Sequence, residues 1–248
     1  MSEANATVER HYESLLGLRY TWMMGGIERC QREARALLDA LGLTGGLSGQ
    51  TVLDLGSGPG YHARALAERD ARVVAVDMSD ACLDELRREC QGLAVIALHA
   101  DLLDRNAYEK YGPFAAVLCL GDTLPHLGSH DDVVRLLETA RDLLTPGGIV
   151  ALEFREQPRE LMAEDAVFTV RSERDRIMQC VLHFEPDRLW VTDVVHEWDG
   201  KGWKTLKGSY AKLRLRPGET IAAAARCGLQ VQLNELRLGR RILKFSRS

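Results

Sequence analysis

The sequence predicts an α/β fold in which a parallel sheet wound with helices carries an antiparallel β insertion. Five short apolar runs alternate with helical patterns between residues 51 and 154, and a Gly-rich segment follows the first run. After residue 158 the runs become longer and alternate between apolar and polar residues. Near-continuous apolar strands are typical of parallel sheets that are buried on both faces, whereas alternation is typical of strands with one solvated face.

The N-terminal region is predicted to be helical from Thr7 to about Leu43, with a break at Gly25-Gly26. After the break, apolar residues recur at helical spacing, which predicts one buried face. Residues 1–46 are therefore assigned to an N-terminal helical cap.

The core domain is assigned to residues 47–160, where apolar runs are separated by turns and helical patterns. A helix predicted over residues 130–144 ends at the Thr-Pro-Gly-Gly segment of residues 145–148, because Pro and Gly interrupt helical structure. The predicted strands are Thr51–Leu55, Arg72–Asp77, Leu93–Asp101, Phe114–Asp122 and Ile149–Phe154.

Residues 161–215 are assigned to the antiparallel insertion, because several runs alternate there between apolar and polar residues. Segments at residues 186–187 and 199–202, rich in Asp, Gly and Pro, are typical of hairpin turns. Residues 216–248 carry one more helix, which begins at Pro217, and apolar strands that we expect to complete the core sheet.

Composition and charge limit the class of protein. The 248 residues are 46% hydrophobic and 27% charged, which is ordinary for a globular chain. The net charge of -4 disfavours a general binder of nucleic-acid phosphates. No apolar run approaches the roughly 20 residues that span a bilayer, and the polar N-terminal segment does not resemble a secretory or transit signal. We therefore expect a soluble, cytoplasmic protein with no membrane partner.

The six cysteines are scattered without paired spacing, and no Cys or His pairs stand at the spacing of zinc ligands. Buried thiols in a reducing compartment are the simplest interpretation, and we expect no metal.

The segment VLDLGSGPG, at residues 52–60, is the most informative part of the chain. A strand that turns sharply into a helix while its backbone approaches a ligand needs residues without a Cβ. Dinucleotides and S-adenosylmethionine are both bound by such turns. Here the glycines are spaced GxGxG, Pro59 removes an N–H that a pyrophosphate site uses, and Asp54 places a negative charge beside the loop. These features favour S-adenosylmethionine, which carries an ammonium group. The glycines are Gly56, Gly58 and Gly60.

Two further acidic residues end the next two predicted strands. Asp77 is placed to accept both ribose hydroxyls of a nucleoside, and Asp101 to accept the adenine amino group. One such residue alone is as readily explained as a cap of a strand or helix. Three acids behind successive strands predict a nucleoside site instead.

Residues 51–154 resemble the core of the class I S-adenosylmethionine-dependent methyltransferases of small-molecule type. VLDLGSGPG is similar to the family's first motif, VVAVDMSDACL to its acidic second-strand motif, HADLLD to its adenine-binding motif, and TPGGIVALEF to the segment leading into its fifth strand. The resemblance implies a Rossmann-like, doubly wound sheet of seven strands with one strand reversed, and S-adenosylmethionine as cofactor. The residues expected to bind it are Tyr20, Trp22, Arg29, Asp54, Gly56, Gly58, Gly60, Asp77, Met78, Asp101, Leu102 and Leu120.

A narrower likeness concerns the fourth strand. LCLGDTLPHL, at residues 118–127, is similar to the corresponding segment of glycine and sarcosine N-methyltransferases. The match implies that Arg155 clamps a substrate carboxylate and that His126 lies near the acceptor. Asp122 departs from the pattern, because the relatives have Asn there, and this puts glycine in doubt as the substrate.

Methyl transfer from a sulfonium is an in-line displacement that depends on alignment, and a general base is needed only if the acceptor arrives protonated. His126 and Asp122 are the predicted catalytic residues, with Glu153 as a further candidate base, because all three follow strands at their carboxyl ends. Two of them also have a structural interpretation: His126 as a loop residue bonded to the backbone, and Asp122 as a cap of the turn before Pro125.

The acceptor is predicted to be a small molecule with a nitrogen or oxygen nucleophile. Tyr12, His126, Arg155 and Tyr210 are its predicted contacts. The N-terminal segment is expected to fold over the cofactor with Gly25-Gly26 as hinge, and the insertion to form a wall of the acceptor pocket or the surface of a homodimer. Core packing is the structural interpretation of the N-terminal aromatic residues.

Three other functions share parts of this pattern. A nucleic-acid methyltransferase has the same core, but the fourth strand lacks the Asn/Asp-Pro-Pro-aromatic motif of base amino methylation. A dinucleotide oxidoreductase and a non-catalytic S-adenosylmethionine-binding module are the other two. Binding of NADH in place of S-adenosylhomocysteine would identify a dinucleotide oxidoreductase. Turnover of the cofactor would distinguish an enzyme from a non-catalytic binding module.

Overall fold

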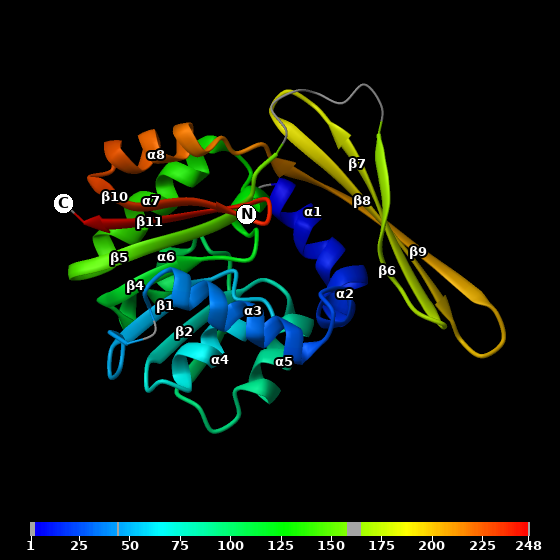
Figure 1. The fold of residues 1–248 in the computed structure, drawn as a ribbon, viewed down its shortest axis with the longest axis horizontal. Helices are drawn as coiled ribbons and strands as arrows, with labels where there is room; N and C mark the ends of the chain where they lie inside the picture. Colours follow the sequence, from blue (N-terminus) through cyan, green and yellow to red (C-terminus); the bar gives the residue numbers. More distant parts are fainter. Residues whose placement is uncertain (1–2, 44, 158–164, 248) are drawn as a thin grey trace.

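A seven-stranded sheet forms the centre of the molecule, and a computed structural model describes residues 3–43, 45–157 and 165–247. The strand order is β10-β11-β5-β4-β1-β2-β3 (Figure 1). All neighbours pair in parallel except β11, which runs antiparallel to both β10 and β5. The predicted fold class, with its one reversed strand, is confirmed. The strands are β1 (Thr51–Leu55), β2 (Arg72–Asp77), β3 (Val95–His99), β4 (Phe114–Cys119), β5 (Leu144–Arg155), β10 (Leu229–Arg237) and β11 (Arg240–Arg247).

Helices cover both faces of this sheet, because its central strands are apolar on both sides. One face packs on α3 (Ile27–Ala40), α4 (Tyr61–Ala67) and α5 (Asp80–Glu89), which contribute Leu38, Leu66 and Leu83 to the core. The other face packs on α6 (Arg105–Tyr108), α7 (His130–Leu143) and α8 (Pro217–Arg226), where Leu137 is fully buried. Two short 3-10 turns, η3 (Glu109–Tyr111) and η4 (Leu124–His126), complete the loops. All six cysteines are free and buried.

The insertion is a separate antiparallel sheet in the order β6-β7-β8-β9. It lies beside the core, with the N-terminal helices between the two (Figure 1). Its inner face packs on Leu15 and Leu16 of the N-terminal segment, and Arg19 forms a bidentate ion pair with Glu197 at 2.7 and 2.9 Å. The strands are β6 (Ala166–Ser172), β7 (Arg176–Phe184), β8 (Arg188–Trp198) and β9 (Trp203–Leu213).

The N-terminal segment before Gly25 is a series of short helical turns. They are α1 (Glu3–His11), η1 (Tyr12–Leu16), η2 (Gly17–Arg19) and α2 (Tyr20–Met23). Glu13 binds this segment to the core by accepting the backbone N–H of Asp80, the first residue of α5, at 2.7 Å. Helix α3 follows the break and packs on the sheet beside α4, so the segment next to the insertion ends near residue 24.

Some local features differ from the expectations. The turn predicted at residues 145–148 lies within β5 and not before it. Leu144 pairs with Phe114 of β4, the pairing register then shifts, and it resumes at Ile149. The short helices α6 and η3 were not predicted, since four and three residues are too few to show helical periodicity. Among the described residues, no helix is long and apolar enough to cross a bilayer.

Candidate functional site

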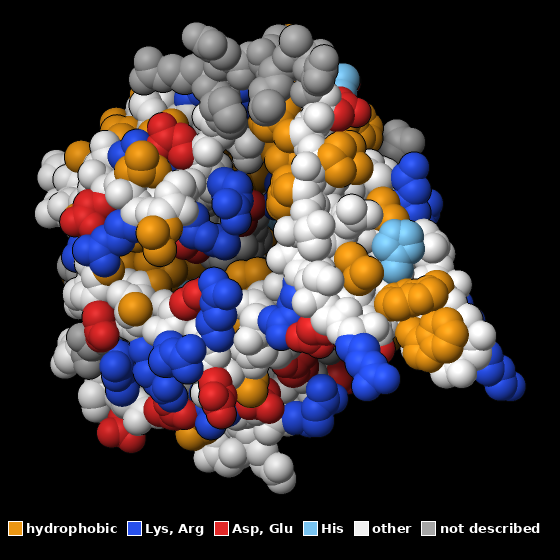
Figure 2. Space-filling model, turned by 45° about the vertical axis from the view of Figure 1, so that its right-hand side comes forward, with side chains coloured by type: hydrophobic (Ala, Val, Ile, Leu, Met, Phe, Trp, Pro, Cys, Tyr) orange, Lys and Arg blue, Asp and Glu red, His pale blue; other side chains and the backbone are white. Residues whose placement is uncertain are grey.

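A cavity of about 660 Å³ opens at the carboxyl ends of β1, β2, β4 and β5. Its other walls come from the N-terminal helices, from β6 of the insertion and from the hairpin between β10 and β11. Figure 2 shows a hollow between the core and the insertion, with Lys and Arg side chains along its rim. The volume lies within the range of pockets that enclose small ligands.

The Gly-rich loop after β1 forms one wall of this cavity. Gly56, Gly58 and Gly60 have φ angles of +72°, +53° and +82°, which residues with a Cβ rarely adopt. A Cβ on Gly56 would overlap Thr123, and a Cβ on Gly60 would overlap Leu86. At Gly58, by contrast, no protein atom lies within 4 Å of such a Cβ, so the backbone there is open to a ligand.

Asp77 lies at the end of β2 and faces the same space. Its two carboxylate oxygens accept the backbone N–H groups of Gly58 at 2.7 Å and Ser79 at 2.9 Å. Burial raises the pKa of this carboxyl, and the backbone hydrogen bonds oppose that rise. Ser57 also lines the cavity, and its buried hydroxyl has no hydrogen-bond partner among the described residues. Because a carboxylate has about four lone-pair sites, Asp77 keeps acceptor capacity for a ligand.

Four predicted cofactor residues lie outside the cavity lining: Trp22, Asp54, Gly60 and Asp101. Asp54 is 1% exposed beneath the loop, and burial together with the charge of Asp77 raises its pKa to about 7. Asp101 accepts the N–H of Leu103 within its own turn, while Met78, Leu102 and Leu120 line the cavity. Gly60 contributes conformation and packing against Leu86 rather than cavity surface.

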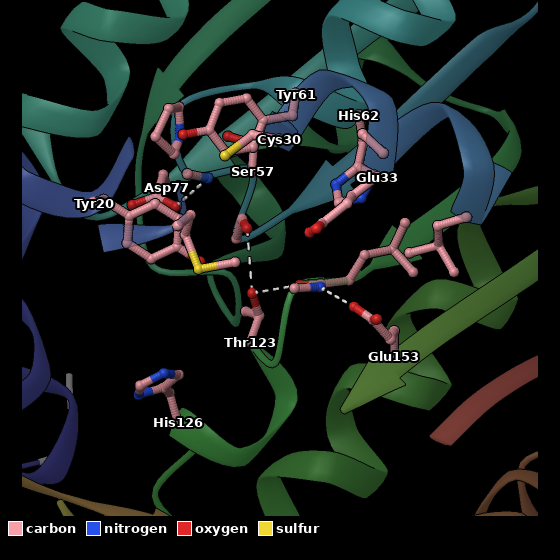
Figure 3. Close-up of a pocket in the computed structure, with 18 of the residues that line it drawn as sticks. Tyr20, Cys30, Glu33, Ser57, Tyr61, His62, Asp77, Thr123, His126 and Glu153 are labelled. Atoms are coloured by element: carbon pink, nitrogen blue, oxygen red, sulfur yellow. Dashed lines mark hydrogen bonds between the residues drawn. The ribbon is translucent and has the colours of Figure 1, made fainter. Parts of the chain in front are cut away.

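His126, in η4, borders the cavity from another side. Its ring lies edge-on to Tyr12, with centroids 5.8 Å apart, and stacks on Tyr210 at 5.3 Å. Its Nδ1 is buried and has no partner among the described residues. Burial, reinforced by the charge of Lys212, lowers the pKa of this imidazole to about 3. His126 is therefore neutral at physiological pH. In Figure 3 it lies apart from the group formed by Asp77, Ser57 and Tyr61.

Asp122, the second predicted catalytic residue, does not line the cavity. One oxygen accepts the backbone N–H of Arg155 at 2.8 Å, and the other accepts Lys212 Nζ at 2.6 Å. Burial alone would raise the pKa of this carboxyl, but Lys212 reverses the effect and the net shift is downward. An ionised carboxylate with both oxygens engaged holds its neighbours in place and is a poor proton acceptor.

The N-terminal aromatic residues divide between two surfaces. Tyr12 and Tyr20 line the cavity with ring centroids 6.2 Å apart. Trp22 instead packs towards the insertion, where the guanidinium groups of Arg171 and Arg176 lie 5.5 and 5.0 Å from its ring. Arg29 lines the cavity opening, but its guanidinium is paired with Glu33 at 2.7 Å.

The predicted acceptor contacts also divide. Arg155 lines the cavity with an exposed side chain, and Tyr12 lines it with a half-buried one. Tyr210 lies behind His126, 4% exposed and outside the lining. Its other ring neighbour is His11, at 4.6 Å, whose Nε2 lies 2.9 Å from the buried carboxylate of Asp193.

Several lining residues were not among the predicted contacts. Thr123, the residue after the predicted Asp122, places its hydroxyl 3.2 Å from the carbonyl of Gly56 and 2.8 Å from that of Leu120 (Figure 3). Glu153, considered only as a base, accepts the backbone N–H of Gly121 at 2.9 Å. Adjacency to a motif could have indicated Ser57 and Thr123. Arg237 and Arg240 enter only because the last hairpin folds back to the end of β5, which no local pattern shows.

Comparisons with known proteins agree with this geometry. Residues 52–148 match the family model described as a methyltransferase domain. A ubiquinone biosynthesis O-methyltransferase from Acinetobacter baylyi is 32% identical over 108 residues, which are 43% of this chain and 44% of that protein. A cypemycin N-terminal methyltransferase from a Streptomyces species is 32% identical over 149 residues, covering 55% and 59%. The match thus spans less than half the length of the first relative.

Solved structures extend the likeness to the whole fold. An S-adenosylmethionine-dependent methyltransferase from Clostridium acetobutylicum has a TM-score of 0.76 and 15% identity, covering 93% of this chain and 98% of that one. An amino pentose methyltransferase from Micromonospora echinaspora has a TM-score of 0.70 and 21% identity, covering 92% and 94%. The solved structures thus confirm the fold that the resemblance implies, and residues 52–148 are similar to a methyltransferase domain.

The residues at the cavity fit S-adenosylmethionine. The open backbone at Gly58 lets a ligand approach the loop, Asp77 retains acceptor capacity for ribose hydroxyls, and the unpartnered hydroxyl of Ser57 faces the same space. Met78 and Leu102 add apolar side chains to the lining of the same cavity. Among the described residues, no cluster of three or more His, Cys, Asp or Glu side chains is placed to hold a metal.

Proposed function

We propose that this chain is an S-adenosylmethionine-dependent methyltransferase that acts on a small-molecule acceptor with a nitrogen or oxygen nucleophile. The observation that carries the proposal is the Gly-rich loop at Gly56–Gly60 beside the Asp77 carboxylate, in a cavity that His126 and Arg155 also line. The buried free cysteines support a cytoplasmic location.

The cofactor side of the cavity binds and orients. Asp77 accepts the ribose hydroxyls, while the backbone hydrogen bonds from Gly58 and Ser79 fix its orientation. Ser57 donates its free hydroxyl to the same ligand. When bound, S-adenosylmethionine supplies a methyl group on a sulfonium, which is a good leaving group. Tyr12 and Tyr20 exclude water from that side, and burial raises the pKa of both phenols, so they remain neutral.

His126 aligns the acceptor. Because its imidazole is neutral and its Nδ1 is buried and unpartnered within the described structure, it accepts a hydrogen bond from the acceptor's N–H or O–H. A pKa of about 3 makes His126 a weak base. Its contribution is therefore orientation of the lone pair towards the methyl group, and the released proton passes to water. Alignment of this kind lowers a barrier by up to about 7–11 kcal/mol.

Asp122 acts as a positioning residue in this proposal. It joins the end of β4 to the end of β5 through Arg155, and to the insertion through Lys212. These contacts fix η4, and with it His126, relative to the strand that carries Tyr210. The insertion thereby becomes the outer wall of the acceptor space.

Incubation with labelled S-adenosylmethionine and a panel of small amines, phenols and sugars tests the proposal. We expect S-adenosylhomocysteine to form with at least one acceptor, and His126→Ala to lower kcat without weakening S-adenosylhomocysteine binding. Methylation confined to RNA or DNA would favour a nucleic-acid methyltransferase. Tight cofactor binding with no turnover across the panel would favour a non-catalytic module.

A further inference from the structure

Three arginines stand side by side where the sheet meets the cavity. Arg240 is the register partner of Arg155 on β5 and of Arg237 on β10. Directly paired residues point to the same face of a sheet, and neighbouring strands lie about 4.8 Å apart. All three residues line the cavity. The hairpin and β5 therefore present a row of guanidinium groups to one ligand space.

The charges behind this row only partly neutralise it. Arg240 lies 3.3 Å from Glu153, and Arg237 forms an ion pair with Glu235 at 2.8 Å. Arg155 has no hydrogen bond or ion pair from its side chain within the described ranges. Glu153 is also engaged by the backbone N–H of Gly121. Three guanidinium groups are therefore paired with two carboxylates, which leaves one positive charge of the row without a counter-charge among the described residues.

Such a row is unfavourable for folding alone. Like charges directly opposite one another on neighbouring strands destabilise a sheet. The hairpin turn adds a further cost, because Leu238 adopts a φ of +48° and is fully exposed. Leu238 also lines the cavity, so the strained turn extends the apolar wall beside the arginines. A ligand that carries negative charge would offset the repulsion among the arginines.

We infer that Arg155, Arg237 and Arg240 form an oxyanion subsite for the acceptor, so that the substrate class is small molecules bearing a phosphate or carboxylate group. The inference rests on the proposed function, since it takes the remainder of the cavity to hold the cofactor. Arg29, which is paired with Glu33 and also lines the cavity, is left to face the amino-acid end of the cofactor. Guanidinium groups suit oxyanions because they donate two parallel hydrogen bonds.

Calorimetric titration of the protein saturated with S-adenosylhomocysteine tests this subsite. The probes are inorganic phosphate, pyrophosphate and succinate, which separate a phosphate source of the oxyanion from a carboxylate source. We expect at least one to bind, and Arg155→Ala and Arg237→Ala each to weaken that binding about tenfold. Arg216→Ala is the matched control, because it removes the same charge from an exposed site paired only with Glu219, and we expect it to have no effect.

A second pair of titrations, with S-adenosylhomocysteine and 5′-methylthioadenosine, asks whether the row holds the cofactor's own carboxylate. The inference requires both ligands to bind the arginine variants as they bind the wild type. Selective loss of S-adenosylhomocysteine binding would overturn it, as would absence of binding by all three probes or an equal effect of Arg216→Ala. Failure of S-adenosylhomocysteine to bind the wild type would instead reject the proposed function, whatever the anions do.

Discussion

Replacement of Lys212 by Met is expected to destabilise the protein strongly. The Lys212–Asp122 pair is 2.6 Å long, and its side chains are 13% and 11% exposed. Removal of one partner leaves a buried carboxylate without its counter-charge, which costs about 3 kcal/mol. For a chain of this size that corresponds to a fall in Tm on the order of 10 °C. The loss should be coupled to Asp122, so the Lys212→Met/Asp122→Asn double variant should recover more than half of it.

Urea denaturation followed by tryptophan fluorescence measures this effect, because Trp22 packs against the insertion and the other three tryptophans lie within it. Lys204→Met is the matched control on the same strand, because its pair with Asp199 is exposed, and its urea midpoint should equal that of the wild type. A loss below about 1 kcal/mol for Lys212→Met, or a double variant that loses the sum of both single effects, would refute the reasoning.

The other predictions concern the loop and two buried ionisable groups. Gly58→Ala should lower the free energy of unfolding by only about 1 kcal/mol, because the residue has a positive φ, yet it should abolish measurable S-adenosylhomocysteine binding. Gly60→Ala should lose more stability in urea titrations, because the added Cβ would overlap Leu86. Asp54, with its pKa raised to about 7, binds more protons folded than unfolded between pH 4 and 7, so its contribution to stability falls as pH rises through that range. Asp54→Asn should remove this decline in urea midpoints measured at pH 5 and 7.5. His126, with its pKa lowered to about 3, has the opposite sign, and His126→Gln should lessen the loss of stability as pH falls below 6.5.

Much of the core was predictable because its signals are local. The apolar runs set β1 and β2 at the residues expected, Ser79 caps α5 through the N–H of Cys82, and the Gly-rich loop identified the ligand-binding turn. These features depend on periodicity, capping and backbone conformation, all of which act over a few residues.

The rest of the site depends on contacts between distant segments. Asp101 is predicted to contact the adenine on the basis of the motif that contains it, and in the structure its carboxylate accepts the N–H of Leu103 within its own turn. Asp122 is a plausible base from its position in the sequence, but Lys212, 90 residues further along the chain, forms an ion pair with its carboxylate. Trp22 is predicted to contact the cofactor, but its ring packs against two arginines of the insertion in cation–π contacts. Side chains of this kind have several physically satisfactory partners, and only the tertiary arrangement decides among them.

The central claim, that Asp77 and the Gly-rich loop bind S-adenosylmethionine, is tested most directly by isothermal titration with S-adenosylhomocysteine. The wild type should bind it and should not bind NADH. Asp77→Ala should weaken the affinity at least tenfold, or about 1.4 kcal/mol. Asp80→Ala, which removes a nearby exposed carboxylate, should leave the affinity unchanged. Equal affinities for the wild type and Asp77→Ala, or binding of NADH in place of S-adenosylhomocysteine, would contradict the account.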